Sequence, residues 1–293
     1  MESARCKAFL KSVELGSFRA AAEELGYTPP AVSQLVAALE KELGVSLLTR
    51  SKKGVTVTSE GSRFVPLVRS YIARETDIYQ LAAELRGMSV GDLSIAAYPS
   101  VATTWLPEIV RRFQQRYPGV HISIMEGVRP EIFHHLDMHD ADMGFMAYAE
   151  PMEYEWIPLA EEKMIAVVPD DHPLAGAGSY PMSECENDDF IMTSWGQDRE
   201  IMELFKRNNV NPNIKYTTYD TPAALAMVRM GLGVSLVNEL SAQYWNDHLV
   251  KLPLDPPETV TFGIVLTSEE HMTRAARKFL SYAVKYISEE GQK

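Results

Sequence analysis

Small and hydrogen-bonding side chains recur along one side of a short helix predicted near the N-terminus. At about 100° per residue, that side carries Pro30, Ser33, Gln34, Ala37 and Lys41. The opposite side is aliphatic and comprises Val32, Leu35, Val36, Leu39 and Leu43. Hydroxyl and amide groups near a helix N-terminus can hydrogen-bond to base edges in a DNA groove, while backbone N–H groups approach phosphate. This pattern favours a DNA-reading helix, and an ordinary amphipathic helix pair in a larger bundle is the alternative.

Capping residues separate this helix from the one before it. Ser17 is a natural N-cap for a helix over residues 18–25, whose apolar positions recur at i, i+3, i+4 and i+7. Gly26 ends that helix, Thr28 can cap the next one, and Pro29 stands at its first position, where a missing N–H costs nothing. The stretch therefore predicts two short helices joined by a tight turn.

A basic turn between two short β-like runs follows the helix pair. The runs cover residues 45–49 and 55–58, and the turn between them contains a glycine, so the pattern predicts a hairpin, or wing. Arg50, Lys52 and Lys53 would then lie beside the DNA backbone, where cations add affinity that does not depend on base sequence. A solvated turn is the alternative for these three charges.

Residues 58–87 form a long helical stretch with an apolar stripe. The apolar positions recur in pairs at a spacing near seven, and a single helix cannot bury such a stripe on itself. We therefore expect a partner helix, which a coiled-coil-like dimer provides. Pro66 removes a helical hydrogen bond and is expected to kink this helix. In such a dimer the two reading helices must lie about 34 Å apart, or a multiple of that, on a two-fold DNA site.

The charge of the chain is unevenly distributed. The 293 residues carry a net charge of −12, but residues 1–74 hold 11 basic and 7 acidic side chains. The remaining residues hold 17 basic and 33 acidic side chains, so a head of +4 precedes a body of −16. This asymmetry is typical of a basic DNA-binding head on an acidic body that binds something else.

No segment is expected to enter a membrane or the secretory pathway. No apolar run approaches the roughly 18 residues of a membrane span, and the N-terminus lacks the long apolar core of a signal peptide. Cys6 and Cys185, the two cysteines, form no disulfide framework. We therefore expect a cytoplasmic protein with no membrane partner.

From residue 91 onward, predicted strands and helices alternate. The strands cover residues 93–97, 120–125, 143–147, 163–168, 190–193, 214–218, 234–237, 249–252 and 261–266. The helices cover residues 103–117, 130–138, 200–208, 222–230 and 271–287. This alternation predicts α/β units with a parallel sheet, and two such units fit into the remaining chain. We therefore expect two lobes with a cleft between them.

Hydroxyl-bearing residues follow a strand in each of the two units. Ligands of such units bind at the carboxyl ends of strands, beside helix N-termini. In the first unit Ser100, Val101 and Thr103 hold this position, and Ser100 would contact a ligand or merely cap the following helix. In the second unit Thr193 and Trp195 occupy the equivalent corner, where Trp195 would stack on an aromatic ligand or plug the lobe interface.

Two weaker candidates also lie in the first unit. Arg129 follows another strand, and its planar guanidinium suits a carboxylate ligand, although a surface arginine is the commoner arrangement. Tyr148 lies at the crossing between the units. No metal site is expected, because His134, His135 and His139 cannot share one helical face. Since no nucleophile–base motif or nucleotide loop is present, we expect no catalytic residue, no cofactor and no enzyme.

The residues of the head allow a family to be named. The pattern comprises Phe9, residues 13–18, Ala21, Ala22, Leu25, residues 28–34, Leu39, Glu40, residues 43–45, residues 47–50, Val57, Thr58 and Gly61. With these residues the head strongly resembles the LysR-type transcriptional regulators. Val228 and residues 231–234 extend the resemblance into the second unit.

This resemblance implies a mixed fold class and a division of the chain. It implies a winged helix-turn-helix over residues 1–58, a linker and dimerisation helix over residues 59–87, and an effector-binding domain over residues 91–293. That domain would be α/β and similar to type 2 periplasmic binding proteins. Its lobe I would cover about residues 91–160 plus 266–293, and its lobe II about residues 161–265. The family also implies a homotetramer built from homodimers.

The resemblance also implies roles for individual residues. The candidate DNA-binding residues are Thr28, Pro29, Pro30, Ser33, Gln34, Arg50, Lys52 and Lys53. A Ser or Thr at the position of Ser100 commonly contacts the effector in this family. Leu48 stands where members usually have Phe, which should alter packing only. Pro29 stands where many members have a polar residue that can touch DNA, and this difference would limit base recognition at the N-terminal end of the reading helix.

The sequence thus predicts a DNA-binding transcriptional regulator. Its binding to a pseudo-palindromic duplex operator would be modulated by a small-molecule effector, for which a carboxylate is one candidate. RNA polymerase would be a further partner if the output is activation. An enzyme fused to a DNA-binding head is the alternative.

Overall fold

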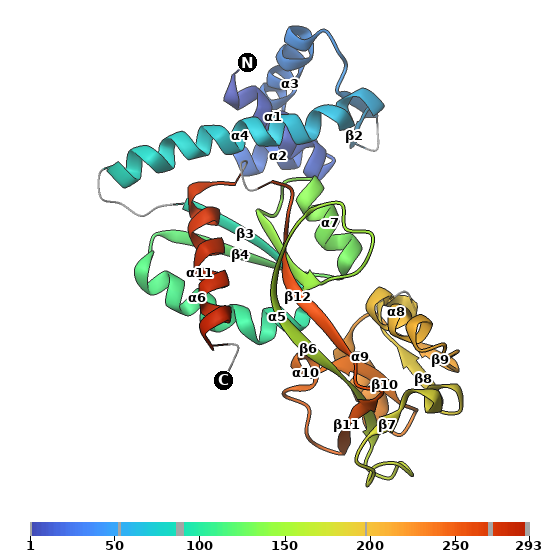
Figure 1. Ribbon diagram of the computed structural model, residues 1–293. Helices are drawn as coiled ribbons and strands as arrows, with labels where there is room; N and C mark the ends of the chain where they lie inside the picture. Colours follow the sequence, from blue (N-terminus) through green and yellow to red (C-terminus); the bar gives the residue numbers. More distant parts are fainter. Residues whose placement is uncertain (1, 52–53, 86–90, 197, 269–271, 291–293) are drawn as a thin grey trace.

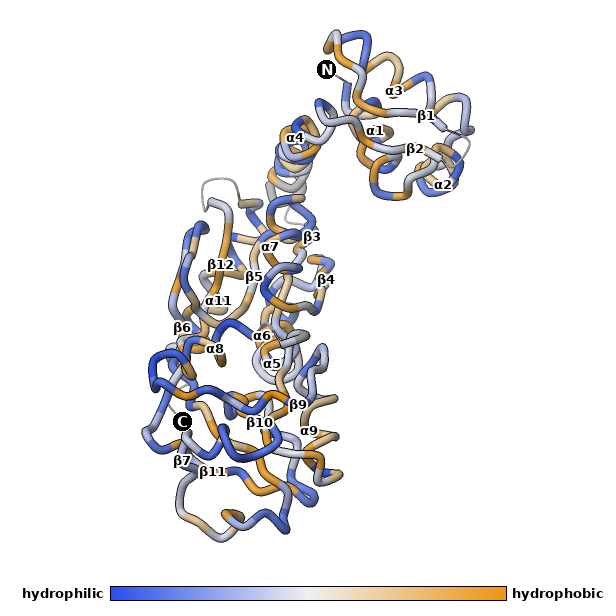
Figure 2. The backbone as a smooth tube through the Cα atoms, turned by 90° about the vertical axis from the view of Figure 1, so that its right-hand side faces the viewer, coloured by the Kyte–Doolittle hydropathy of each residue, from blue (hydrophilic) through white to orange (hydrophobic). Residues whose placement is uncertain are grey.

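A computed structural model describes residues 2–51, 54–85, 91–196, 198–268 and 272–290 of the chain (Figure 1). A small helical head, a first lobe and a second lobe follow one another along the length of the molecule (Figure 2). The predicted cations Lys52 and Lys53 lie outside the described residues.

Three helices and a hairpin form the head. They are α1 (Ser3–Leu15), α2 (Phe18–Leu25), α3 (Pro29–Leu43), β1 (Leu48–Ser51) and β2 (Gly54–Val57). Ser17 and Thr28 cap α2 and α3, since each hydroxyl accepts a hydrogen bond at 3.4 Å from the backbone N–H three residues later. Val32, Val36 and Leu39 are fully buried in the core of the head. The aliphatic side of α3 therefore faces inward, as the sequence predicts.

The wing begins later than the sequence predicts. The strand was expected from residue 45, but β1 begins at Leu48 and pairs antiparallel with β2. The carboxylate of Glu40 accepts hydrogen bonds from the backbone N–H groups of Leu47 and Leu48, at 2.8 and 3.0 Å. Because a side chain satisfies these donors, the segment before Leu48 has no need of a strand partner.

A long helix, α4 (Ser59–Leu85), leads from the head to the first lobe (Figure 1). It continues through Pro66 as one helix, so the proline does not end it. Leu67 and Ile78 keep 66% and 69% of their surface exposed, and they belong to the apolar stripe predicted to meet a partner helix. Arg69 faces the first lobe and forms an ion pair with Asp140.

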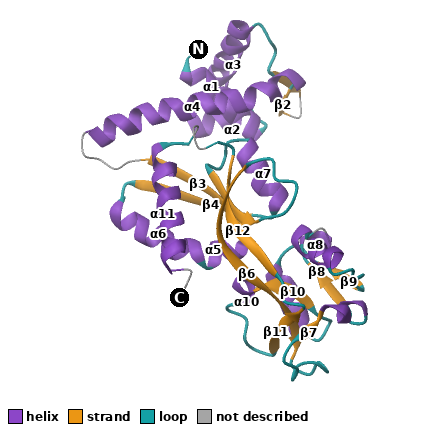
Figure 3. Ribbon diagram, viewed as in Figure 1, coloured by secondary structure: helices purple, strands orange, loops and turns teal. Residues whose placement is uncertain are grey.

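An eight-stranded sheet passes through both lobes, in the order β4-β3-β5-β12-β6-β11-β7 with β10 paired to β6 (Figure 3). Its strands are β3 (Gly91–Ala97), β4 (Val120–Glu126), β5 (Met143–Ala147), β6 (Glu155–Pro169), β7 (Tyr180–Pro181), β10 (Ser235–Asn238), β11 (Leu249–Asp255) and β12 (Thr259–Leu266). β3 is parallel to β4 and β5, whereas β12 and β6 pair antiparallel with each other. The sheet is therefore mixed and not parallel throughout, because these two long strands carry the chain between the lobes in opposite directions.

Helices cover the strands of both lobes. In lobe I they are α5 (Pro99–Thr103), α6 (Trp105–Arg116), α7 (Arg129–Asp137) and α11 (Arg274–Glu290). Lobe II adds η1 (Met182–Glu186), β8 (Phe190–Met192), η2 (Ser194–Gly196), α8 (Arg199–Arg207), β9 (Ile214–Thr217), α9 (Thr221–Arg229) and α10 (Glu239–Ala242). The helix predicted over residues 103–117 corresponds to α6, and the sequence did not predict the short helix α5 that precedes it and meets it at Thr104.

Each lobe has its own apolar core. The core of lobe I contains Phe113, Phe145 and Phe279, all fully buried. It also includes Phe262 and Leu266, so β12 already belongs to lobe I from Phe262 onward. The returning chain therefore crosses between the lobes within the first residues of β12, and β6 makes the outward crossing.

Candidate functional site

The exposed side of α3 and the wing form one surface of the head. Pro30 and Gln34 are exposed, and Ser33 is half-buried on the same side of the helix. From β1, the Nη1 atom of Arg50 donates a hydrogen bond of 2.8 Å to the Ser33 hydroxyl. The Arg50 guanidinium also lies 5.2 Å from the centre of the Phe18 ring. The wing cation is thus held directly beside the predicted reading residues.

This surface has the chemistry of a DNA contact. Thr28 and Pro29, at the start of α3, are exposed as well, and no acidic residue occupies the first turn of the helix. Pro29 and Pro30 carry no N–H, and the N–H of Ala31 is bound by the Thr28 hydroxyl, so a phosphate at this turn would meet side chains and not free N–H groups. Glu40 lies 3.9 Å from Arg50 Nη2, so the guanidinium already has weak contacts within the protein.

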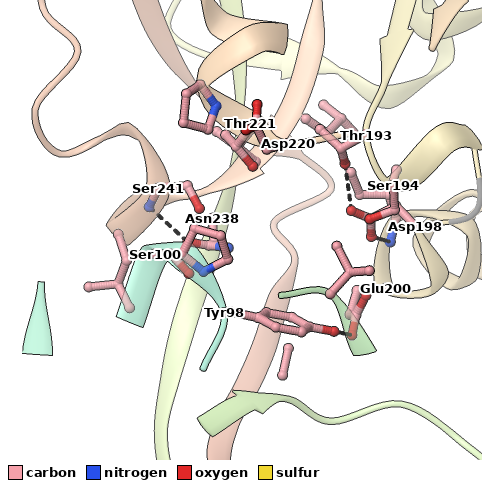
Figure 4. Close-up of a pocket in the computed structure, with 18 of the residues that line it drawn as sticks. Tyr98, Ser100, Thr193, Ser194, Asp198, Glu200, Asp220, Thr221, Asn238 and Ser241 are labelled. Carbon is pink, nitrogen blue, oxygen red and sulfur yellow. Dashed lines mark hydrogen bonds between the residues drawn. The ribbon is translucent and has the colours of Figure 1, made fainter. Parts of the chain in front are cut away.

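A cavity of about 200 Å³ lies between the two lobes (Figure 4). Lobe I contributes Tyr98, Pro99, Ser100, Thr103, Val128 and Ala147 to its wall. Lobe II contributes the strand-to-helix corners that start at Thr193 and Asp220, together with α10 and its flanks. Met164, Val260 and Phe262 come from the strands that cross between the lobes. A molecule bound here would contact both lobes at once.

Three of the predicted effector residues lie in the cavity wall. Ser100 is 9% exposed and is the second residue of α5, so it does not cap that helix. Within the described part of the chain its hydroxyl has no hydrogen-bond partner. The Thr103 hydroxyl donates to the carbonyl of Pro99 at 2.8 Å, and that of Thr193 donates to Asp198 at 2.6 Å. Ser100 is therefore the free hydroxyl among the three.

The other predicted effector residues lie behind the wall or outside the described part. Val101 is fully buried in the core of lobe I. Tyr148 donates its hydroxyl proton to Glu150 and does not reach the wall. Arg129 is 7% exposed and donates to the carbonyls of Ala147 and Ala149, at 3.0 and 3.2 Å. The backbone of Trp195 lies in η2, but its side chain falls outside what the structure describes.

Three acidic side chains in the wall were not predicted from the sequence. Asp198 and Asp220 cap α8 and α9, where they accept hydrogen bonds from the backbone N–H groups of Ile201 and Ala223. Glu200 follows in the first turn of α8 (Figure 4). The capping pattern of an Asp before a helix is visible in the sequence. The sequence does not show, however, that folding brings both capping residues to the same cavity.

Glu200 joins the lobes across the cavity. The hydroxyl of Tyr98, in lobe I, donates to Glu200 Oε1 at 2.8 Å, and Arg129 Nη2 lies 3.6 Å from the same oxygen. Burial raises the pKa of Glu200 to about 8; the nearby Asp198 raises it further, while Arg129 opposes the shift. A second link between lobes runs from the hydroxyl of Tyr219 to Glu131. These contacts stabilise the relative orientation of the two lobes seen in the structure.

Helix α7 lies between the cavity and α4. Val128, which precedes it, lines the cavity, and Arg129 and Glu131 in its first turn contact lobe II. Past its other end, Met138 packs against the core shared by the head and α4, and Asp140 pairs with Arg69. The segments that flank this one short helix thus contact the cavity at one end and α4 at the other.

Within the described residues, no group of three or more His, Cys, Asp and Glu side chains could hold a metal ion. No helix in the same ranges is long and apolar enough to span a membrane. Both cysteines are buried as free thiols.

Two family models match this chain. The model described as "Bacterial regulatory helix-turn-helix protein, lysR family" matches residues 4–62, and the one described as "LysR substrate binding domain" matches residues 86–287. The chain is 28% identical over 294 residues to YvbU of Bacillus subtilis (strain 168), described as an uncharacterized HTH-type transcriptional regulator, which covers 99% of this chain and 100% of the relative. It is 30% identical over 231 residues to the transcriptional activator protein LysR of Escherichia coli (strain K12), covering 78% of this chain and 74% of that one.

Solved structures agree with this assignment at the level of the fold. Full-length CbnR, complexed with its target DNA, superposes with a TM-score of 0.68 at 22% identity, covering 98% of this chain and 100% of that one. The arrangement of head, long helix and two lobes is therefore one already seen in a protein bound to DNA.

Proposed function

Because the chain belongs to the LysR family of bacterial transcriptional regulators, we propose that an effector held between its two lobes controls how it binds a two-fold operator. The chain is a DNA-binding regulator of transcription with an effector-binding domain, and its relatives are regulators, so the enzyme alternative is not supported. One observation carries the proposal: a cavity of about 200 Å³ with walls from both lobes. A ligand in this cavity would make different contacts in different arrangements of the lobes. An effector needs such a difference in affinity in order to favour one arrangement over another.

On the DNA side, we assign base contacts to the exposed side of α3, with Gln34 and Ser33 as the hydrogen-bonding groups. Arg50, Lys52 and Lys53 then bind phosphates from the wing, while Thr28, Pro29 and Pro30 bring the start of α3 against the groove. The bond from Arg50 to Ser33, at 2.8 Å, supports this division because it keeps the wing cation beside the reading helix.

On the effector side, we assign direct contact to Ser100, Thr103 and Thr193, and stacking to Trp195. Val101, Arg129 and Tyr148 then act from behind the wall. Arg129 supports this role because its guanidinium holds the loop carbonyls of residues 147 and 149 and reaches Glu200, instead of facing a ligand.

Dimerisation through α4 is part of the same proposal. Leu67 and Ile78 on that helix are 66% and 69% exposed. Large apolar side chains exposed along one stripe are typical of a surface that packs against another protein. A partner helix would cover them and would set the two reading helices about 34 Å apart. Two such dimers would form the homotetramer. Since its target is DNA, we place the protein in the cytoplasm, with RNA polymerase as a partner if it activates.

We further propose that α7 transmits the state of the cavity to the head. Its first turn contacts lobe II through Arg129 and Glu131, and the turn after its other end holds Arg69 of α4. Closure of the lobes around a ligand would shift the first turn, and a short rigid helix would pass that shift to α4.

Selection from a random duplex pool tests the DNA-binding part of the proposal. The full-length protein should enrich a pseudo-palindrome whose half-sites are separated by about one helical turn or a multiple of it. Enrichment of a single site without two-fold symmetry would contradict the dimeric arrangement of the reading helices.

A further inference from the structure

We propose that the cavity between the lobes takes a small organic amine: a positively charged group on a compact apolar body. The inference deepens the proposed effector role of this cavity and rests on it. It sets aside a carboxylate as the effector.

The charges at the wall are unbalanced. Asp198, Glu200 and Asp220 all contribute to it, and among its described residues there is no Lys, Arg or His. The cation behind the wall, Arg129, is engaged by the carbonyls of Ala147 and Ala149 and by Glu200. Glu200 thus has a cation beside it, but no cation among the described lining residues faces the half-buried Asp198 and Asp220, and partly desolvated charges are normally paired.

Two of the helix N-termini at the cavity, those of α8 and α9, are already occupied by carboxylates, whereas α5 and α10 begin there with uncharged caps. A helix start normally attracts negative charge through its free N–H groups. Here the carboxylates of Asp198 and Asp220 already occupy those positions on α8 and α9, with hydrogen bonds of 3.2 and 2.9 Å to Ile201 N and Ala223 N. A ligand carboxylate would meet these side chains first and would be repelled.

An unpartnered hydroxyl faces the same space. Ser100 is 9% exposed, lines the cavity, and has no hydrogen-bond partner among the described residues. An ammonium group carries three donors and no acceptor, so it can satisfy a hydroxyl oxygen and carboxylate oxygens together. The raised pKa of Glu200, about 8, fits such a site, because a nearby cation would draw that carboxyl into its ionised form.

The rest of the wall combines uncharged polar side chains with an apolar and aromatic part. Leu236, Phe262 and Tyr244 belong to that part, and aromatic faces also attract cations. Its volume of about 200 Å³ is below the roughly 300–1,000 Å³ of sites for drug-sized ligands. The ligand is therefore small, with its charge at one end.

Matched compounds of one shape and three charges test this inference. Benzylamine, benzyl alcohol and benzoate are added to the full-length protein at equal ionic strength, and the thermal midpoint and the dissociation constant are measured. The cyclohexyl analogues of the three are measured in parallel. The amine of each set should bind at least tenfold more tightly than its alcohol, and the carboxylate should bind most weakly.

A matched pair of variants locates the effect. Asp220→Asn keeps a good helix cap while removing one charge, and it should weaken amine binding about tenfold without weakening the alcohol. Asp247→Asn removes an exposed carboxylate outside the cavity wall and should change neither. Tighter binding of the carboxylates or alcohols, or an amine affinity that Asp220→Asn leaves unchanged, would overturn the amine assignment while keeping the cavity as a ligand site. If no compound of either set binds, the effector role of the cavity fails together with this inference.

Discussion

Our proposal for DNA binding depends on two side chains of the head, Arg50 and Gln34. Arg50 is held by the Ser33 hydroxyl at 2.8 Å and by the Phe18 ring, so it is positioned before DNA arrives. Gln34 on the next position of α3 is exposed and carries both donors and acceptors. In the proposed binding mode, Arg50 attracts any phosphate and Gln34 distinguishes bases.

Replacing these two residues should have different consequences. Gln34→Ala should weaken binding to the selected operator by about 1–3 kcal/mol, with little change for random DNA. Arg50→Ala serves as its control, since it should weaken both and reduce the salt slope by about one. Titrations of both duplexes at several salt concentrations give these numbers. Equal losses for Gln34→Ala on the two duplexes would remove it from base reading.

The buried carboxyl of Glu200 should make stability depend on pH. Its pKa is raised to about 8, so the folded protein keeps a proton that the unfolded chain loses above about pH 4.3. The resulting stability is fully present below the unfolded pKa and is lost as pH rises through about 8.

Glu200→Gln isolates this contribution, because an amide oxygen can still accept the hydrogen bond from Tyr98. The wild-type protein should lose up to about 4 kcal/mol relative to Glu200→Gln between pH 5 and pH 9. Urea unfolding across that range measures the difference. A difference that stays constant with pH would mean that Glu200 is ionised in the folded state throughout.

The helices were easier to predict than the sheet and the site. Ser17, Thr28 and the aliphatic stripe of α3 act within one or two turns, so local spacing was enough to predict them. The mixed direction of the sheet depends on β6 and β12, which are distant in sequence and pair only in the folded chain. The acidic side chains of the cavity wall could not be predicted for the same reason: the caps of α8 and α9 are separate in sequence and meet only in the folded chain.

Helix α7 offers a test of transmission between the lobes and the head. Arg69 and Asp140 pair at its end, with side chains that are 14% and 35% exposed. Asp140→Asn leaves the arginine without its partner and should lower the free energy of unfolding by about 1–3 kcal/mol, less than for a fully buried pair. Arg69→Met combined with Asp140→Leu should recover most of this loss, since two apolar side chains leave no buried charge without a partner.

The double variant then separates stability from transmission. It should bind the ligand of the cavity as the wild-type protein does, while its operator binding no longer responds to that ligand. Thermal shift and operator titration measure the two properties on the same sample. A response equal to that of the wild-type protein would show that the contact between Asp140 and Arg69 carries no signal.

The whole molecule connects a basic head to an acidic, ligand-sized cavity through one long helix. The chain has a net charge of −12, yet its first 74 residues are basic, so DNA attracts only the head. The stripe on α4, with Leu67 and Ile78 exposed, gives a second copy a place to pack. In the proposed dimer, packing of the two α4 helices sets the distance between the reading helices, and we expect lobe closure to change it.

Operator footprinting with and without a cavity ligand tests the central claim most directly. The protein, the selected operator and whichever compound of the matched set raises the thermal midpoint are combined, and the protected DNA and the affinity are compared. The compound should change the footprint or the affinity for the wild-type protein, while Ser100→Leu, which fills the cavity wall, should bind the operator and not respond. A wild-type complex unaffected by a bound ligand, or a Ser100→Leu protein that responds equally, would contradict the account.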